Sequence, residues 1–221
     1  MLLSTDVDGT ITIQGKHEIC INSMRAIREL RKAGVKVILN SGNSLPFLLS
    51  LYRYLGVDYV IAENGCVYYD KKRIVEICEN KGRDLVKYLD RFPELRRTTF
   101  AEFRKYDLSY KILYMTSDLV DRVKEITKGS FNILITKNTL HIIPKEGGKG
   151  VGLRALLKDL SISDQIAAIG DSLTDLSQFK EANVSGAVSD SDPRIFSHVT
   201  YVMSKPACLG FDEFVNKVFR K

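Results

Sequence analysis

The sequence predicts an α/β fold, a Rossmann-like parallel-sheet core with a small inserted α+β cap domain. Short apolar runs alternate with segments of helical period, which is the pattern of βαβ units. From about residue 81 the strands lie closer together and include a Lys137-Asn138 turn, which is typical of antiparallel pairing. After Gly147-Gly148 the first pattern resumes. We expect the core domain at 1–79 and 147–221 and the cap at 80–146.

Each element is predicted by its apolar pattern and by the residues that end it. Leu2-Leu3 begins a buried strand at the N-terminus, and Gly34 and Gly56 end helices with apolar residues at helical spacing. Further core strands are expected at 35–39, 59–62, 66–69, 73–77, 166–169, 184–188 and 199–203. Core helices are expected at 44–56, 149–160 and 173–181, with a short helix that begins at 192 and a last helix that closes the chain near 219. In the cap we expect helices at 85–89 and 118–128, strands at 110–115, 132–136 and 139–143, and an irregular stretch at 93–107.

The composition is that of a globular protein, with 44% hydrophobic and 27% charged residues in a chain of 221. The net charge of +6 is spread along the chain without an Arg-rich block, so we expect small anionic ligands rather than nucleic acid. No apolar run approaches the roughly 18 residues of a membrane span, and the first strand leaves no room for a signal peptide. We expect a cytoplasmic protein without a membrane partner, as a monomer or homodimer.

The four cysteines are Cys20, Cys66, Cys78 and Cys208, and none of them forms a C-x-x-C pair. Their apolar or mixed surroundings favour free buried thiols in a reducing cytosol over a structural disulfide. The histidines are scattered, so no zinc pattern is present.

Two carboxylates follow the first strand in the stretch Asp6-Val7-Asp8-Gly9-Thr10. Side chains alternate along an extended chain, so Asp6 and Asp8 lie on the same side. Adjacent carboxylates repel unless a cation or a proton lies between them, which indicates a metal or acid/base site. An isolated D-x-D-G sequence can equally be an Asp-rich turn, so other residues must decide.

Further polar clusters occur at equivalent places in the predicted sheet. Ser41-Gly42-Asn43 and Gly170-Asp171 each follow a buried strand, Asp175 lies four residues later, and Lys149 opens a helix. Ligands of open parallel sheets bind outside the carboxyl ends of the strands. Clustered carboxylates favour Mg²⁺, while a lysine and backbone N–H groups suit a phosphoryl group. Alone, Lys149 would be a solvated lysine at a helix start; together with the other clusters it is a candidate ligand for phosphate.

The chain resembles the haloacid dehalogenase (HAD) superfamily over its whole length. Within that superfamily it is most similar to archaeal-type phosphoglycolate phosphatases, with sucrose-phosphate phosphatase-like enzymes as neighbours, because the cap is short and a Glu63-Asn64-Gly65 loop is present. The four superfamily motifs correspond to Asp6–Thr10, Ser41–Asn43, Lys149, and Gly170–Ser172 with Asp175.

The resemblance implies a role for each motif residue. Asp6 would be the nucleophile that forms an aspartyl-phosphate, and Asp8 the general acid and then base. The implied Mg²⁺ ligands are Asp6, the Asp8 main-chain carbonyl, Asp171 and Asp175, and the implied phosphate-binding residues are Ser41, Gly42, Asn43 and Lys149. Two positions depart from many relatives, which have Asn at Thr174 and Arg at Asn43.

We expect a Mg²⁺-dependent phosphoric monoester hydrolase that acts on a small phosphorylated metabolite. The leading candidate substrate is 2-phosphoglycolate. A sugar phosphate or another small ester is the alternative substrate, and a phosphotransferase, a mutase or a regulatory module without turnover are alternative functions. Arg104, Lys105, Tyr110 and Lys111 of the cap are candidates to meet a substrate carboxylate, or else belong to a solvated surface.

Overall fold

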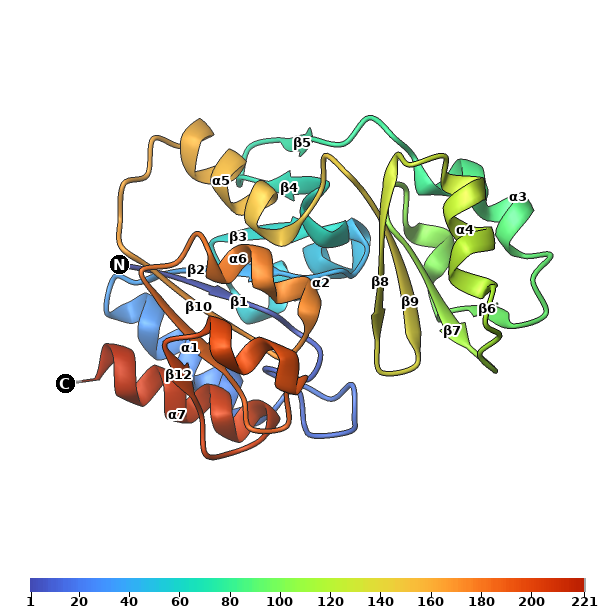
Figure 1. The fold of residues 1–221 in the computed structure, drawn as a ribbon. Coiled ribbons are helices and arrows are strands. Elements are labelled where there is room, and N and C mark those ends of the chain that lie inside the picture. The colour runs from blue at the N-terminus through green and yellow to red at the C-terminus, as the bar shows by residue number, and fades with distance from the viewer. Residues whose placement is uncertain (221) are drawn as a thin grey trace.

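The computed structural model describes residues 1–220, whose strands form one sheet of eight and one of four (Figure 1). In the larger sheet the order is β12-β11-β10-β1-β2-β3-β4-β5, parallel from β12 to β3 and antiparallel beyond. The predicted α/β fold with a parallel sheet is confirmed. Its strands are β1 (Leu2–Thr5), β2 (Lys36–Asn40), β3 (Tyr59–Ala62), β4 (Val67–Tyr69), β5 (Ile74–Glu76), β10 (Ile166–Gly170), β11 (Val184–Ala187) and β12 (Tyr201–Val202).

Helices cover both faces of this sheet, so its buried strands carry apolar side chains on both faces. Leu3 packs with α1 (Ile21–Lys32), α2 (Leu45–Leu55) and α7 (Ala207–Phe219), whereas its neighbour Leu2 packs with α5 (Lys149–Asp159) on the opposite face. The short helix α6 (Leu176–Phe179) lies beside α5. Within residues 1–220, no helix has the combination of length and apolar character that crossing a membrane requires.

The smaller sheet is antiparallel and has the order β6-β7-β9-β8. Tyr110, Leu140 and Ile142 on one of its faces pack against the helices α3 and α4. Alternation along β9 therefore turns Thr139 and His141 toward the opposite face, on the core side in Figure 1. The elements are α3 (Val86–Leu89), β6 (Leu95–Arg97), β7 (Leu108–Ile112), α4 (Leu119–Thr127), β8 (Phe131–Thr136) and β9 (Thr139–Pro144).

Several elements differ from the prediction. The stretch expected to be irregular contains β6, and the predicted strand at 110–115 begins earlier, as β7. The helix expected at 173–181 is divided into a 3₁₀ turn and α6. The 3₁₀ turns are η1 (Glu63–Gly65), η2 (Gly82–Leu85), η3 (Ala101–Phe103), η4 (Leu173–Asp175) and η5 (Pro193–His198).

All four cysteines are paired, so the expectation of free thiols is wrong. Cys20 and Cys208, 188 residues apart, form a disulfide with their Cα atoms 6.1 Å apart, because α1 packs against α7. Cys66 precedes β4 and Cys78 follows β5, and the pairing of these strands brings the two Cα atoms within 4.9 Å. The sequence could not show the first pairing, which depends on the tertiary contact of α1 with α7, whereas the second closes two neighbouring strands that the sequence predicts.

Candidate active site

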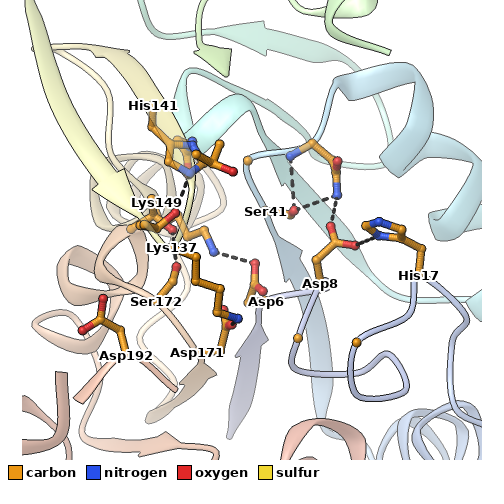
Figure 2. Close-up of a pocket in the computed structure, with 18 of the residues that line it drawn as sticks. Asp6, Asp8, His17, Ser41, Lys137, His141, Lys149, Asp171, Ser172 and Asp192 are labelled. Atoms are coloured by element: carbon orange, nitrogen blue, oxygen red, sulfur yellow. Dashed lines mark hydrogen bonds and ion pairs between the residues drawn. The ribbon is translucent and has the colours of Figure 1, made fainter. Parts of the chain in front are cut away.

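The candidate site lies at the carboxyl ends of three adjacent parallel strands. Asp171 follows β10, Asp6 and Asp8 follow β1, and Ser41 follows β2. Lys149, the first residue of α5, lies among them in a cleft of about 420 Å³ (Figure 2). The clusters that are far apart in the sequence thus line one cleft, at the sheet edge where ligands of such folds bind.

Lys149 is buried, 1% exposed, between two carboxylates. Its Nζ donates to Asp6 Oδ1 at 2.6 Å and to Asp175 Oδ1 at 2.5 Å. Burial disfavours the charged form of Lys149, but the negative charges of Asp175 and Asp6 have the larger effect and raise the pKa of Lys149. The lysine therefore provides a fixed positive charge beside Asp6.

A buried polar network beneath the cleft holds this arrangement. Asn40 Nδ2 donates to the carbonyl of Lys149 at 3.1 Å and to Gln178 Oε1 at 3.2 Å, and the hydroxyl of Ser4 donates to the same Gln178 oxygen at 2.8 Å. Gln178 Nε2 in turn donates to Asp175 Oδ1 at 2.7 Å. Sequence reasoning missed this layer, although polar residues inside buried strands are a detectable signal.

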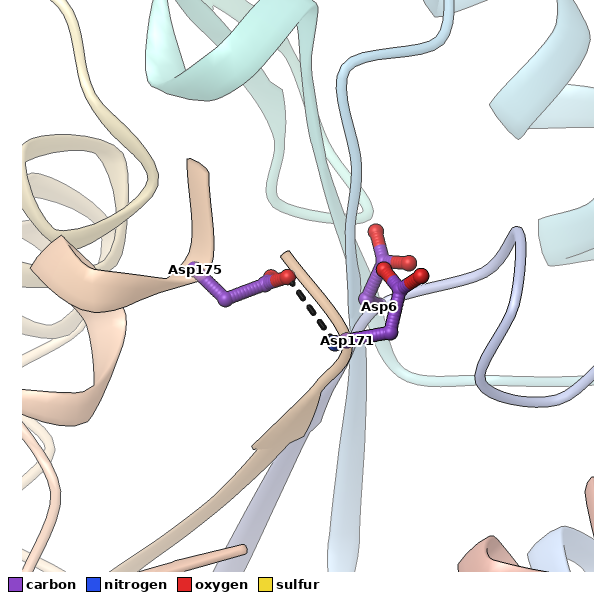
Figure 3. A group of neighbouring side chains, drawn as sticks. All are labelled: Asp6, Asp171 and Asp175. Carbon is purple, nitrogen blue, oxygen red and sulfur yellow. Dashed lines mark hydrogen bonds between the residues drawn. The ribbon is translucent and has the colours of Figure 1, made fainter. Parts of the chain in front are cut away.

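Asp6, Asp171 and Asp175 form a buried carboxylate cluster (Figure 3). Each offers an oxygen, and these oxygens lie within 4.8 Å of one another. Burial and the charges of its neighbours raise the pKa of Asp6 well above its ordinary value, although Lys149 opposes the shift. Burial is the main reason that the pKa of Asp171 is raised to about 6, and the negative charge of Asp175 adds to the increase. Carboxylate oxygens that repel one another in a buried site fit a hard divalent cation.

Asp175 differs from the other two carboxylates in its hydrogen bonds. Besides Lys149 and Gln178, it accepts the backbone N–H groups of Asp171 and Ser172 at 3.1 and 3.0 Å and the Ser172 hydroxyl at 3.2 Å. Both of its oxygens are therefore occupied by donors. The hydroxyl of Thr174 pairs with that of Ser172 at 2.8 Å and lines the cleft.

The Asp8 carboxylate points away from the cluster, toward the other side of the cleft (Figure 2). Asn43 Nδ2 donates to its Oδ2 at 2.6 Å, and Nδ1 of His17 lies 3.1 Å from its Oδ1. His17 stands on the loop after β1. The sequence carried no signal for this contact, because it depends on the path of that loop.

The loop Ser41-Gly42-Asn43 leaves fewer N–H groups free than its sequence suggests. Ser41 N–H donates to the carbonyl of Ile61 at 3.0 Å, and Asn43 N–H donates to Ser41 Oγ at 3.2 Å. Within residues 1–220 the Gly42 N–H has no hydrogen-bond partner. An anion can therefore be met by this N–H and by the Ser41 hydroxyl.

The cap closes the other side of the cleft with Arg104, Thr136, Lys137, Thr139 and His141. Lys137, at the tip of the β8–β9 hairpin, places its Nζ 3.6 Å from Asp171 Oδ2. Of the four cap residues proposed to meet a carboxylate, Arg104 lines the cleft. The other three point elsewhere: Lys105 pairs with Glu76, Tyr110 donates to Asp90, and Lys111 is exposed.

The η1 loop after β3 connects the core to the cap. Glu63 Oε2 accepts the backbone N–H groups of Lys105 and Tyr106 at 2.8 and 2.6 Å. Asn64 Nδ2 donates to Asp107 Oδ2 at 2.5 Å. The cap segment that carries Arg104 is therefore held directly by a loop of the core.

Known proteins share both this sequence and this fold. A family model described as haloacid dehalogenase-like hydrolase matches residues 3–128 and 94–210. The phosphoglycolate phosphatase of Metallosphaera sedula is 33% identical over 97% of both chains. Phosphoglycolate phosphatase 1 of Saccharolobus solfataricus is 33% identical over 99% of this chain and 96% of its own.

Solved structures agree on the fold. Protein 0175 of Thermoplasma acidophilum superposes with a TM-score of 0.83 at 23% identity, over 98% of this chain and 96% of its own. The sucrose-phosphatase of Synechocystis superposes with a TM-score of 0.75 at 18% identity, over 98% of this chain and 97% of its own.

The fold, the carboxylate and lysine cluster and these matches define a class of enzyme: the chain belongs to the haloacid dehalogenase-like hydrolases. Within that family it is similar in sequence to archaeal proteins named phosphoglycolate phosphatase. The resemblance inferred from the motifs is confirmed.

Proposed function

We propose that this protein is a Mg²⁺-dependent phosphatase that hydrolyses 2-phosphoglycolate to glycolate and phosphate through an aspartyl-phosphate on Asp6. The main support is the position of Asp6, a buried carboxylate 2.6 Å from the Lys149 ammonium and within a carboxylate cluster. The relatives named phosphoglycolate phosphatase, at about 30% identity over nearly the whole chain, support the choice of substrate.

In the first step an Oδ of Asp6 attacks phosphorus, and the bond between phosphorus and the ester oxygen breaks. Asp8 donates a proton to the leaving oxygen, which departs as an alcohol. In the second step Asp8 takes a proton from water as that water attacks phosphorus, the Asp6–phosphorus bond breaks, and phosphate leaves. Lys149, Ser41 and the Gly42 N–H stabilise the charge on the phosphoryl oxygens.

The residues that would hold Mg²⁺ are Asp6, the main-chain carbonyl of Asp8, and Asp171. The ion would neutralise charge between these carboxylates and the phosphoryl group. Asp175 is occupied by donors, so we assign it to holding Lys149 and the backbone of Asp171 in place. This assignment differs from the role as a direct ligand that the sequence motif implied.

Phosphate release from p-nitrophenyl phosphate and 2-phosphoglycolate, with and without Mg²⁺, tests the proposal. Asp6→Asn should lose activity by at least about 10³-fold because it removes the nucleophile. Asp192→Asn is the matched control, since Asp192 also lines the cleft but its carboxylate pairs with Arg194. Activity that survives Asp6→Asn, or that needs no divalent cation, would contradict the mechanism. A phosphorylated isomer as product would indicate a mutase instead.

A further inference from the structure

The cap residues that line the cleft have no role in the proposed phosphoryl transfer. The core side carries the carboxylates and Lys149, whereas Arg104, Thr136 and His141 face them from the cap. The part of the substrate beyond the phosphoryl group must contact this cap side. Among residues 1–220, the cap residues that line the cleft include no carboxylate. The surface is therefore rich in hydrogen-bond donors, and its charged side chains, Arg104 and Lys137, are both cations.

Arg104 is oriented by a chain of contacts that begins at the phosphate-binding loop. A β-carbon placed on Gly42 would lie 2.8 Å from Asn64 Nδ2, so the Asn64 amide packs directly on that loop. Asn64 donates to Asp107, which is fully buried, and the other oxygen of Asp107 accepts Arg104 Nη1 at 2.6 Å. Two side chains thus separate the guanidinium of Arg104 from the loop.

The guanidinium retains most of its hydrogen-bonding capacity. Its side chain is 11% exposed, and Asp107 uses one of its N–H groups. Within residues 1–220 the other guanidinium N–H groups have no partner. A planar group with several free donors matches a carboxylate, which it can bind through two parallel hydrogen bonds. Asp107 already balances the charge of Arg104, so the match to a carboxylate lies in the paired geometry of the free N–H groups, which a sugar hydroxyl does not reproduce.

His141 lines the cleft with Arg104 and Lys149 and lies within the electrostatic field of both. Burial lowers the pKa of His141 to about 4; the charge of Asp107 opposes the decrease, and the charges of Arg104 and Lys149 add to it. The imidazole is therefore neutral and lies within the field of both cations. Its Nε2 is 2.8 Å from Thr136 Oγ1, and its Nδ1 is buried without a partner. A bound ligand could supply the missing hydrogen bond.

We propose that Arg104 is the residue that selects the substrate, by binding a carboxylate a short distance from the phosphoryl group, with His141 beside it. The preferred substrates are then phosphate esters of small hydroxy acids. One cation, Lys149, meets the phosphoryl end, and Arg104 meets the carboxylate end. This inference rests on the proposed phosphatase function and adds the group that distinguishes an acid ester from a sugar ester.

Steady-state kinetics with matched substrates test the assignment. 2-Phosphoglycolate and ethyl phosphate share a two-carbon skeleton, and only the former has a carboxylate. The wild type should prefer 2-phosphoglycolate by at least about 100-fold in kcat/KM. Arg104→Gln should lower kcat/KM for 2-phosphoglycolate by at least about 50-fold, mainly through KM, and that for ethyl phosphate by less than about threefold. Lys105→Gln is the matched control, since its ammonium pairs with Glu76.

Equilibrium binding keeps the test independent of turnover and of folding defects. In the Asp6→Asn background, calorimetry should show that Arg104→Gln weakens binding of 2-phosphoglycolate by at least about 50-fold and leaves inorganic phosphate unaffected. If Arg104→Gln does not fold, Arg104→Lys keeps a charge for Asp107 and should lose part of the same preference. Circular dichroism establishes that each variant is folded.

The outcomes separate the two proposals. A wild type that hydrolyses neither ester overturns both of them. A wild type that requires Mg²⁺ and Asp6 but does not prefer 2-phosphoglycolate supports the phosphatase mechanism and overturns the role of Arg104. Equal losses on both substrates in a folded Arg104→Gln variant also overturn that role, because they indicate a general effect on the site.

Discussion

Replacing Gly9 with alanine tests whether the position of Asp171 sets the activity. Gly9 has φ +79°, a left-handed conformation that side chains other than glycine disfavour. A β-carbon at this position would also lie 2.5 Å from Asp171 Oδ2 and 3.0 Å from its Cγ. The substitution therefore strains the backbone and displaces a carboxylate of the proposed Mg²⁺ site.

The two effects have separate magnitudes. The backbone conformation should lower the free energy of unfolding by about 1–2 kcal/mol. The carboxylate would have to retreat by at least about 0.5 Å to restore a contact of 3.0 Å. Since displacements of this size already impair catalytic geometry, we expect kcat/KM to fall about 10- to 100-fold and the Mg²⁺ concentration for half-activation to rise.

Gly34→Ala is the matched control. Gly34 has φ +82° and no atom within 4 Å of the added β-carbon, so it shares the strain without the displaced ligand. Urea unfolding should show similar losses of stability for both variants. Phosphate release from p-nitrophenyl phosphate over a series of Mg²⁺ concentrations should be impaired in Gly9→Ala alone. Equal activity of the two variants would refute the reasoning.

Three further predictions concern pH, covalent crosslinks and the acid/base residue. Without Mg²⁺, the free energy of unfolding of the wild type relative to Asp171→Asn should fall as the pH rises from about 4 to 6, because Asp171 has a pKa of about 6 when folded against 3.8 ordinarily and so binds the extra proton in the folded state. Adding Mg²⁺ should restore stability at about pH 7.5 but not at about pH 4, measured by calorimetry. Replacing Cys20 and Cys208 by serine should cost about 5 kcal/mol in urea unfolding, and removing the other disulfide about 3 kcal/mol, because their sequence separations are 188 and 12 residues. Asn43→Ala removes a donor from Asp8 and should lower kcat about 10- to 100-fold in steady-state assays, with little change in Tm.

Each of these predictions has an opposite outcome. A difference between wild type and Asp171→Asn that rises between about pH 4 and 6 would show that the Asp171 carboxyl is not held protonated by its surroundings. Equal losses for the two disulfides would show that the length of the closed loop does not set their contribution. An unchanged kcat for Asn43→Ala would show that the amide does not orient Asp8.

The residues at the carboxyl ends of the strands could be identified from the sequence because their grouping follows from topology. Once β1, β2 and β10 are parallel neighbours, Asp6, Ser41 and Asp171 must share an edge of the sheet. The contact of Asn43 with Asp8 could not be predicted, since it depends on loop conformation.

Elements that depend on their partners were also missed. The sequence of β6, Leu95-Arg96-Arg97, is short and charged, and it becomes a strand because it pairs with β7. The disulfides likewise follow from the packing of α1 on α7 and from the pairing of β4 with β5. His141 was not identified as a site residue, although its neighbours Leu140 and Ile142 on the apolar face place it on the opposite face.

The two segments that join core and cap are tied together at one place. Glu146 accepts the backbone N–H groups of Glu79 and Asn80 at 3.1 and 2.8 Å, and a β-carbon on Gly147 would lie 2.7 Å from the sulfur of Cys66. A rotation of the cap about this place would also have to break the hydrogen bonds that Glu63 and Asn64 of the core make with the cap. Lys137 lies at the far end of β9, about 20 Å away along the strand, so a pivot of about 10° would move it by about 3.5 Å. If it is directed away from Asp171, a movement of this size about doubles the 3.6 Å between Lys137 Nζ and Asp171 Oδ2 and breaks that ion pair.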